Sequence, residues 1–447
     1  MRKSGFSLLT TLIVGVCALP SAAFAQDAPA APAGAPAAAP AAPGAAPATP
    51  ATEPAAAPPQ APPPAAPAAD AAPAPAAPAA PAADAAPAAP PAPTYPATTI
   101  TGFVEGGYNH VFGAPHPAAQ AAIPTRAYDP SNGFVLHLAH VALKHQLNEH
   151  VFGVIEIDAG ADAAYNHNPG LVPNSTGQDS TLFDIQEAYG VYTDSGFTFT
   201  AGKFATYEGI EVIEGPADPT ISRGFLYWLA EPVTHVGAKL HYATGPLDVG
   251  VGVVNGWDTN NGVFQTGDDN NQKTVIWRAA VTPSPAFFAA FSGTYGVEKP
   301  ASDVDPRLSL DLTGAAVVNE NLTINFQGNY GSEKHSDNAD PTKAASWVGF
   351  GLQPVVKMDA ASLGLRFEYF SDKGLSRTGT GAALNMAMDP NGTDTVGLYN
   401  FTITPGYTLA SAMLLRAEFR VDGASQPILW AGKKTQETLS LGASYSF

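Results

Sequence analysis

The sequence predicts an all-β protein: a transmembrane, up-and-down antiparallel β-barrel of about 16 strands, preceded by a disordered Ala/Pro-rich segment. Three observations lead to this prediction. Runs of 10–13 residues with apolar side chains at every second position repeat from residue 98 to the end. The connections between these runs are alternately short and long. An export signal opens the chain, and no later stretch is long and apolar enough for a transmembrane helix.

Residues 1–25 have the three parts of a secretory signal peptide: two early basic residues, an apolar stretch and a small-x-small cleavage site. We expect cleavage after Ala25. The single cysteine, Cys17, lies within this segment, so the mature chain contains no disulfide. A lipid anchor on Cys17 is the less favoured alternative, because the preceding Val16 is bulky where lipoprotein signals need a small residue.

Residues 26–97 consist almost entirely of alanine and proline and carry only four charged residues, all acidic. Such a segment cannot build a core, and proline at this density favours the extended polyproline II conformation. At about 3.1 Å per residue, a chain of roughly 70 residues reaches about 200 Å when extended. We interpret it as a disordered periplasmic tether, either a plain spacer or a segment that contacts the cell wall.

The remaining residues, 98–447, form the predicted barrel. The clearest run, NLTINFQGNY at 321–330, places leucine, isoleucine, phenylalanine and tyrosine on one face and polar residues on the other. Two runs fit less well, since 134–147 has no clean face and Glu187 falls on the apolar phase of its run. The expected strands are 99–112, 133–147, 150–163, 182–193, 196–205, 232–243, 246–256, 273–283, 286–298, 307–318, 321–333, 345–356, 360–371, 394–404, 408–420 and 435–447.

Short turns and long loops alternate between these strands, as they do in outer-membrane barrels. The expected short turns are 148–150, 194–196, 244–246, 283–285, 319–321, 357–360 and 405–407. The expected long loops are 113–132, 164–181, 206–231, 257–272, 299–306, 334–344, 372–393 and 421–434. A count of 14 or 18 strands stays open if weak runs are misassigned.

A soluble β-sandwich is the alternative fold, and three features weigh against it. The runs are longer than most strands of soluble sheets. The polar phase carries neighbouring opposite charges, such as Arg366 with Glu368, which a dry core would not tolerate. Aromatic residues stand at the ends of runs, where the headgroup girdle of a membrane barrel lies: Tyr108, Tyr192, Tyr242, Tyr295, Tyr330, Tyr369 and Tyr445.

The segment 183–242 carries more than a pattern. Its pieces QEAY, AGKF, EVIE, SRGFL and AEPVTHVG resemble the OmpL-like β-barrel porins of Gram-negative outer membranes. The likeness is specific over about 60 residues and extends as a general pattern over 98–447. It implies passive transport of small solutes, and it does not identify the solute. We expect no cofactor, and no enzymatic activity because no catalytic constellation is visible in the sequence.

The loop 206–231 is the candidate constriction of the pore, because porins commonly fold one long loop into the lumen and this loop also contains the apolar stretch GFLYWLA. Acidic groups there would concentrate cations. The alternative is that these acids only solvate an external loop. The candidate residues are Glu208, Glu211, Glu214, Asp218, Arg223 and Glu231.

Alternation along the strands predicts the charged side chains that face the lumen. Arg278, Arg366, Arg416 and Arg420 are expected to oppose the acidic loop and to create a transverse field. Each residue of the set has a plainer alternative, an internal salt bridge that braces the wall. The full lumen-facing set is Lys144, Glu156, Asp158, Asp184, Lys239, Arg278, Asp311, Arg366, Glu368, Arg416, Glu418 and Arg420.

The last strand ends LSLGASYSF, with apolar residues at every second position. We expect this strand to close the barrel against the first one, because an open edge in lipid leaves backbone groups unpaired. The terminal aromatic pair, Tyr445 and Phe447, resembles the signal by which barrel-assembly machinery recognises its clients.

Metal and catalytic sites are not expected. His137, His140, His145, His150, His235 and His241 lie too far apart along their strands for one coordination shell. The stretches 267–271 and 389–394 faintly resemble calcium loops, but turn formation is the favoured explanation for their Asp, Asn and Gly residues. No GxSxG is present, and no spacing singles out a Ser–His pair.

The charge balance sets the expected partners. The whole chain has a net charge of −18, and residues 98–447 carry 19 basic and 35 acidic residues, a balance of −16. Nucleic acid is therefore excluded as a partner. The expected function is a porin favouring cations or neutral polar solutes, and the alternative is a structural anchor that links the membrane to the cell wall. The expected partners are outer-membrane lipid and lipopolysaccharide, the barrel-assembly machinery, small solutes and two further copies in a homotrimer.

Overall fold

The computed structural model describes residues 94–113, 133–163, 183–257, 272–299, 304–378, 394–427 and 433–447. The expected signal peptide, nearly all of the expected tether and the stretch 267–271 lie outside these residues, as does 389–393. Among the described residues, no helix is long and apolar enough to cross a membrane.

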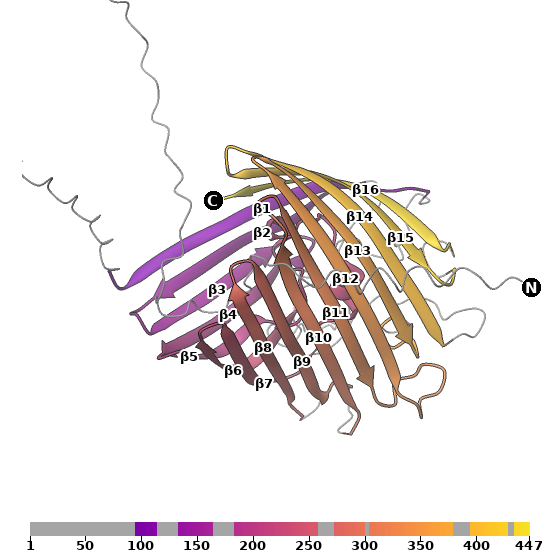
Figure 1. Cartoon of the computed structure of the whole chain (residues 1–447), viewed down its shortest axis with the longest axis horizontal. Coiled ribbons are helices and arrows are strands. Elements are labelled where there is room, and N and C mark those ends of the chain that lie inside the picture. Colours follow the sequence, from indigo (N-terminus) through magenta and orange to yellow (C-terminus); the bar gives the residue numbers. More distant parts are fainter. Residues whose placement is uncertain are drawn as a thin grey trace, which may run out of the picture. The chain divides into compact units, whose positions relative to one another are not determined.

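Sixteen antiparallel strands form a closed barrel in which each strand pairs with its neighbours in sequence and β1 pairs with β16 (Figure 1). The prediction of an up-and-down, 16-stranded barrel is confirmed. The strands are β1 (Ala97–Val111), β2 (Gly133–Gln146), β3 (Val151–Ala159), β4 (Phe183–Asp194), β5 (Phe197–Ala205), β6 (Thr234–Thr244), β7 (Leu247–Val254), β8 (Thr274–Ser284), β9 (Phe287–Val297), β10 (Pro306–Val317), β11 (Leu322–Glu333), β12 (Ala345–Met358), β13 (Ala361–Lys373), β14 (Thr395–Leu409), β15 (Met413–Ala424) and β16 (Thr435–Ser446).

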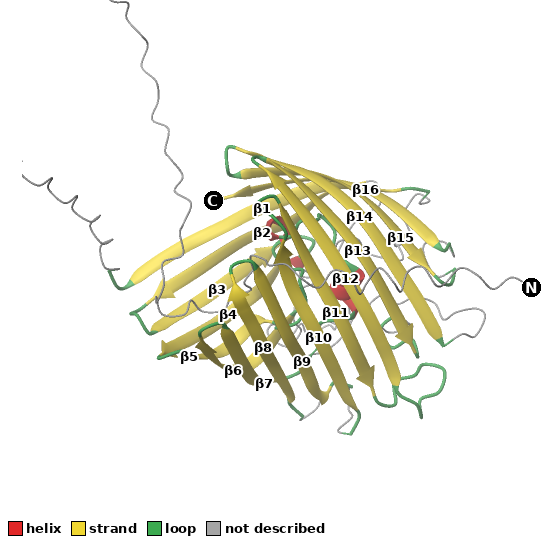
Figure 2. Cartoon of the chain, viewed as in Figure 1, coloured by secondary structure: helices red, strands yellow, loops and turns green. Residues whose placement is uncertain are grey.

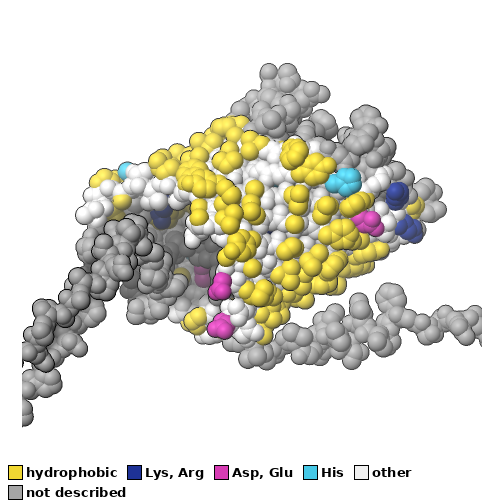
Figure 3. Space-filling model, turned by 90° about the horizontal axis from the view of Figure 1, so that it is seen from above, with side chains coloured by type: hydrophobic (Ala, Val, Ile, Leu, Met, Phe, Trp, Pro, Cys, Tyr) yellow, Lys and Arg dark blue, Asp and Glu magenta, His cyan; other side chains and the backbone are white. Residues whose placement is uncertain are grey.

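The two faces of the barrel wall differ in polarity. Along β16, for example, Leu439 and Leu441 are exposed on the outside, whereas Thr438 and Ser440 are buried toward the lumen. Apolar side chains cover much of the outer surface that the structure describes (Figure 3). The barrel therefore buries its polar face and exposes its apolar face, as expected for a protein surrounded by the hydrocarbon core of a lipid bilayer.

One hairpin differs from the prediction. The stretch 405–407 was expected to be a turn because it contains proline and glycine, but it continues β14. The chain instead reverses at Ala410 and Ser411, whose φ angles are 48° and 60°. Pro405 is tolerated in the strand because the pairing with β15 is interrupted between Ile403 and Gly406.

Two bulges explain the runs that lacked a clean face. The pairing of β1 with β2 shifts between Glu105 and Gly106, and opposite this shift His137 is left as an extra residue in β2. The pairing of β3 with β4 shifts in the same way, because Glu156 pairs with Glu187 and Ile157 with Ile185. The bulge turns Glu187 into the lumen, where only 5% of its surface is exposed.

The C-terminus closes the barrel. The Phe447 backbone N–H donates to the Gly102 carbonyl at 2.9 Å, and the Gly102 N–H donates to the Phe447 carbonyl at 3.0 Å. The aromatic rings of Tyr445 and Phe447 stack at 6.4 Å on the outside of the barrel, where both side chains are exposed.

Deletion of Phe447 is expected to reduce the amount of barrel assembled in the outer membrane, while export across the inner membrane continues. The deletion removes two backbone hydrogen bonds at the seam and the exposed ring. Quantification of heat-modifiable protein in outer-membrane fractions, beside periplasmic precursor, measures the effect. Phe447→Tyr, which keeps an aromatic ring and the backbone pair, is the control. Unchanged assembly of the deletion variant would contradict the assembly-signal hypothesis.

Candidate functional site: a loop bound inside the barrel

Residues 206–233, between β5 and β6, form the candidate site. This segment contains two short helices, η1 (Gly215–Ala217) and α2 (Phe225–Leu229), which lie within the ring of strands (Figure 2). Its side chains and backbone bond to lumen-facing groups of β10, β13 and β15. The segment therefore lies in the lumen, not outside the barrel.

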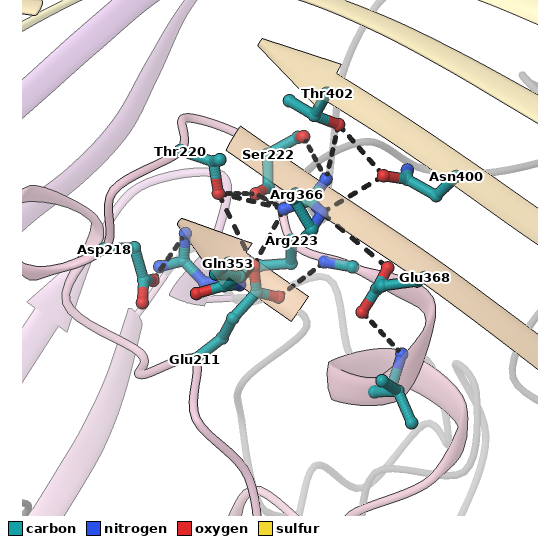
Figure 4. Close-up of polar contacts among 12 residues, drawn as sticks. Glu211, Asp218, Thr220, Ser222, Arg223, Gln353, Arg366, Glu368, Asn400 and Thr402 are labelled. Atoms are coloured by element: carbon teal, nitrogen blue, oxygen red, sulfur yellow. Dashed lines mark hydrogen bonds and ion pairs between the residues drawn. The ribbon is translucent and has the colours of Figure 1, made fainter. Parts of the chain in front are cut away.

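Arg366 of β13 is the main link between the loop and the wall (Figure 4). It is fully buried and lies 2.8 Å from the Glu211 carboxylate. Its guanidinium donates hydrogen bonds to loop and wall together: Glu211 Oε1 at 2.8 Å, Thr220 Oγ1 at 2.9 Å, the Ser222 carbonyl at 2.6 Å, Ser222 Oγ at 2.8 Å, Thr402 Oγ1 at 3.1 Å and Asn400 Oδ1 at 3.2 Å. Five N–H groups serve these six acceptors, so at least one hydrogen is shared, and the whole guanidinium is engaged by loop and wall.

Two wall carboxylates bind the loop backbone. Glu418 accepts hydrogen bonds from the N–H groups of residues 221 and 222, at 2.5 and 3.1 Å. Glu368 accepts those of residues 225 and 226, at 2.7 and 3.3 Å. The N–H groups of Phe225 and Leu226 are the first two of α2, and such groups have no acceptor within the helix. Charge-assisted bonds of this kind hold the loop in one register against β13 and β15.

Two arginines of β15, Arg416 and Arg420, also bind the loop. Arg416 pairs with Glu105 at 2.7 Å and donates to the Asp218 carbonyl at 2.8 Å. Arg420 pairs with Asp422 at 2.8 Å and donates to the Arg223 carbonyl at 2.6 Å. We expected Arg366, Arg416 and Arg420 to face solute. The structure instead buries all three between loop and wall, where each forms an internal salt bridge.

The loop acids are engaged in several ways. Glu211 pairs with Arg366, and Asp218 pairs with Arg223 of the same loop at 3.0 Å. Glu214 is half-buried and accepts a hydrogen bond from Gln186. Sequence reasoning could not see the first pairing, because its partners are 155 residues apart.

Three carboxyl groups, those of Glu208, Glu231 and Asp311, lie close together where the loop meets β10 and β11, and none of them forms an ion pair within the described residues. Glu208 accepts from Ser309 Oγ at 2.5 Å, and Gln327 donates to both Glu231 at 2.8 Å and Asp311 at 2.9 Å. Burial, reinforced by the Asp311 charge, raises the pKa of Glu208 and of Glu231 well above the usual value. Burial therefore favours the neutral form of these two loop acids.

Gly209 makes this arrangement sterically possible. Its φ is +95°, and a Cβ atom there would lie 2.3 Å from both carboxylate oxygens of Glu231. Only glycine fits such a backbone beside a packed carboxyl group.

The apolar part of the loop forms a small core inside the barrel. Phe225, Leu226 and Leu229 of α2 pack with Trp347 and Phe370 of the wall. The expectation that GFLYWLA packs somewhere is met here. Arg377, which sequence reasoning did not single out, donates to the Leu229 carbonyl at 2.7 Å and lies 5.4 Å from the Trp347 ring.

A cavity of about 750 Å³ remains between the loop and the wall, lined by residues from β1 to β6 and from β8 to β11. Among the predicted lumen residues, Lys144, Glu156, Lys239 and Arg278 line it. From the loop, Glu214 lines it with a half-buried side chain, and Glu211, Asp218 and Glu231 line it with buried ones. The structure thus separates the predicted lumen set into residues that face the cavity, residues that hold the loop and residues that brace the wall.

The remaining predicted lumen residues brace the wall. Asp158 pairs with His140 at 2.7 Å, and Asp184 pairs with the buried Lys203 at 3.1 Å. Lys203 was not predicted, because strict alternation places it on the lipid side. Gly202, at a φ of +137°, interrupts the alternation and turns Lys203 inward. The described part of the chain contains no group of three His, Cys, Asp or Glu residues suited to a metal.

Residues 97–447 match a protein family described as "Putative beta-barrel porin-2, OmpL-like". The chain belongs to this family. It is an outer-membrane protein of the porin type, integral to the membrane through its barrel. No curated protein matches the chain in sequence.

Two solved structures share the fold. The outer membrane channel DcaP of Acinetobacter baumannii is 13% identical, with a TM-score of 0.54 over 78% of this chain and 97% of its own. An anion-selective porin from Comamonas acidovorans is 11% identical, with a TM-score of 0.52 over 78% of this chain and 99% of its own. At these identities the comparison establishes the architecture alone.

Proposed function

We propose that this porin lets small hydrophilic solutes diffuse passively through the cavity beside the inserted loop, and that residues 206–231 form its constriction. The observation that carries the proposal is the attachment of the loop. Arg366 and Glu418 hold it inside a closed barrel, and a cavity of about 750 Å³ with both charged and apolar lining residues remains beside it. A loop fixed by buried, charge-assisted bonds keeps the passage at a constant width. No energy coupling is needed.

Ion preference follows from the side chains that line the cavity. The preference for cations expected from the sequence rests on the overall balance of −16 and on the loop acids. Of those acids, Glu211 and Asp218 are paired, and burial raises the pKa of Glu208 and of Glu231, which favours their neutral form. We propose that any cation preference depends mainly on Glu214 and the wall residue Glu156.

Purified protein in a planar bilayer is expected to give stepwise current increases, and Glu214→Gln is expected to shift the reversal potential in a KCl gradient toward chloride. The expected change in permeability ratio is about twofold, because one carboxylate contributes only part of the field in a focused lumen. Glu320→Gln, which removes the same charge from an exposed turn, is the control. Equal shifts in the two variants would show that net charge, and not the cavity, sets the preference.

The alternative function is that of a structural anchor, in which the barrel holds the outer membrane to the cell wall through 26–97. A closed anchor would give no current steps, while deletion of 26–97 would weaken co-sedimentation with cell-wall fragments. We keep the homotrimer as a proposal, to be measured by crosslinking in native membranes. The proposed pore needs no cofactor and performs no catalysis.

A further inference from the structure

Cations of the cavity wall lie over aromatic rings. Lys239 Nζ of β6 lies 4.3 Å from the ring centroid of Phe204 and 4.7 Å from that of Tyr207 in the loop. The Arg278 guanidinium of β8 lies 5.6 Å from the ring centroid of Phe288. All five residues line the same cavity. A ring beneath a cation attracts it electrostatically and so restricts its position.

One strand, β7, lies between these two cations. In the pairing of β6, β7 and β8, Lys239 is opposite Gly252, and Gly250 is opposite Arg278. Adjacent strands are about 4.8 Å apart, so β6 and β8 are separated by about 10 Å. The Lys239 and Arg278 side chains are long enough to span much of this separation, while the His241 ring covers Gly250 and the Ile276 side chain covers Gly252.

The charges around this position leave it positive. Asp248 of β7 is shared between His241 Nδ1 at 3.0 Å and Arg278 Nη1 at 3.7 Å. The Tyr207 hydroxyl bonds His241 Nε2 at 2.5 Å, which holds the Tyr207 ring against Lys239. Arg278 keeps further N–H donors beyond this contact, because a guanidinium carries five.

We propose that Lys239 and Arg278, with the rings beneath them, form a subsite for small organic carboxylates inside the pore. A carboxylate fits between an ammonium and a guanidinium, and the neighbouring Phe204, Tyr207 and Phe288 rings provide an apolar surface for the carbon skeleton. The volume of the cavity accommodates such a molecule. This inference rests on the proposed pore, and it assigns that pore a preferred class of solute.

Current block in a planar bilayer tests the subsite with three probes of nearly equal size: benzoate, benzamide and benzylammonium. Benzoate is expected to reduce or interrupt the open-channel current in a concentration-dependent way, and the neutral and cationic probes are not. Lys239→Gln and Arg278→Gln are each expected to raise the half-blocking concentration of benzoate about tenfold, which corresponds to the loss of one well-formed ionic contact.

Lys144→Gln is the matched control within the cavity. Lys144 lines the same cavity on β2, four strands away from Lys239, and lies 4.2 Å from the Phe152 ring centroid. Its loss is expected to change the half-blocking concentration less than about twofold, since distant charges are screened. Equal effects of all three substitutions would overturn the subsite and leave only a general electrostatic attraction.

Asp248→Asn gives a test in the opposite direction. It removes the competing carboxylate from Arg278, so benzoate is expected to block at a lower concentration. If this variant and the two cation variants all leave the block unchanged while current steps persist, the inference fails and the pore stands. If wild-type protein gives no current steps at all, the proposed function itself fails.

Discussion

Arg366→Gln is expected to release the loop 206–231 from the barrel wall and to increase single-channel conductance. Arg366 is fully buried and bonds the loop at Glu211, Thr220 and Ser222. Removing one member of a buried ion pair costs about 3–5 kcal/mol, because the other charge is left without compensation. The docked loop would then exchange with undocked positions, and the current would become larger and noisier. Planar-bilayer recordings of refolded protein measure both changes.

A double-mutant cycle with Glu211 identifies the cause. Glu211→Gln alone is also expected to disturb docking, since it leaves the Arg366 charge uncompensated. In the double variant neither charge remains, so its effect is expected to be clearly smaller than the sum of the two single effects. Strict additivity would contradict the role given to this ion pair.

Arg307→Gln provides a control for general damage to the barrel. Arg307 pairs with Glu333 at 2.9 Å and joins β10 to β11 within the wall. Its substitution is expected to reduce thermal stability in detergent without a gain in conductance. An equal gain in conductance from Arg307→Gln would show that the current reports wall damage and not release of the loop.

The barrel was predictable because its determinants are local. A strand in lipid needs an apolar residue at every second position, and this period is visible in runs such as 321–330. The prediction failed where a local signal was ambiguous. Pro405 and Gly406 indicated a turn, whereas the chain reverses at Ala410, a residue without turn preference. Bulges such as that at Glu187 shift the period by one residue and leave no composition signal.

The site was less predictable because its contacts are not local. Alternation correctly placed Arg366, Arg416 and Arg420 on the inner face of the barrel. It could not distinguish an arginine that meets solute from one that binds the loop, since that depends on the position of residues about 150–200 positions away. The same limit applies to Lys239 and Arg278, whose aromatic neighbours become visible only when the barrel is closed.

The carboxyl cluster of Glu208, Glu231 and Asp311 makes loop docking sensitive to pH, and the pore is expected to be wider and noisier at pH 9 than at pH 5. In the docked loop, burial raises the pKa of Glu208 and Glu231 well above the ordinary value of 4.5. Docking therefore has its full strength below pH 4.5 and weakens as the pH rises toward the raised pKa values. In that interval each group weakens docking by about 1.4 kcal/mol per pH unit.

Glu208→Gln and Glu231→Gln test this dependence. Each substitution keeps the size and hydrogen-bonding capacity of the side chain but cannot ionise. The double variant is expected to show nearly the same conductance and current noise at pH 5 and pH 9. Glu320→Gln, on an exposed turn, should keep the wild-type dependence. A wild-type conductance that falls with rising pH would contradict the sign of the effect, because it would mean that ionisation of the buried carboxyl groups strengthens docking.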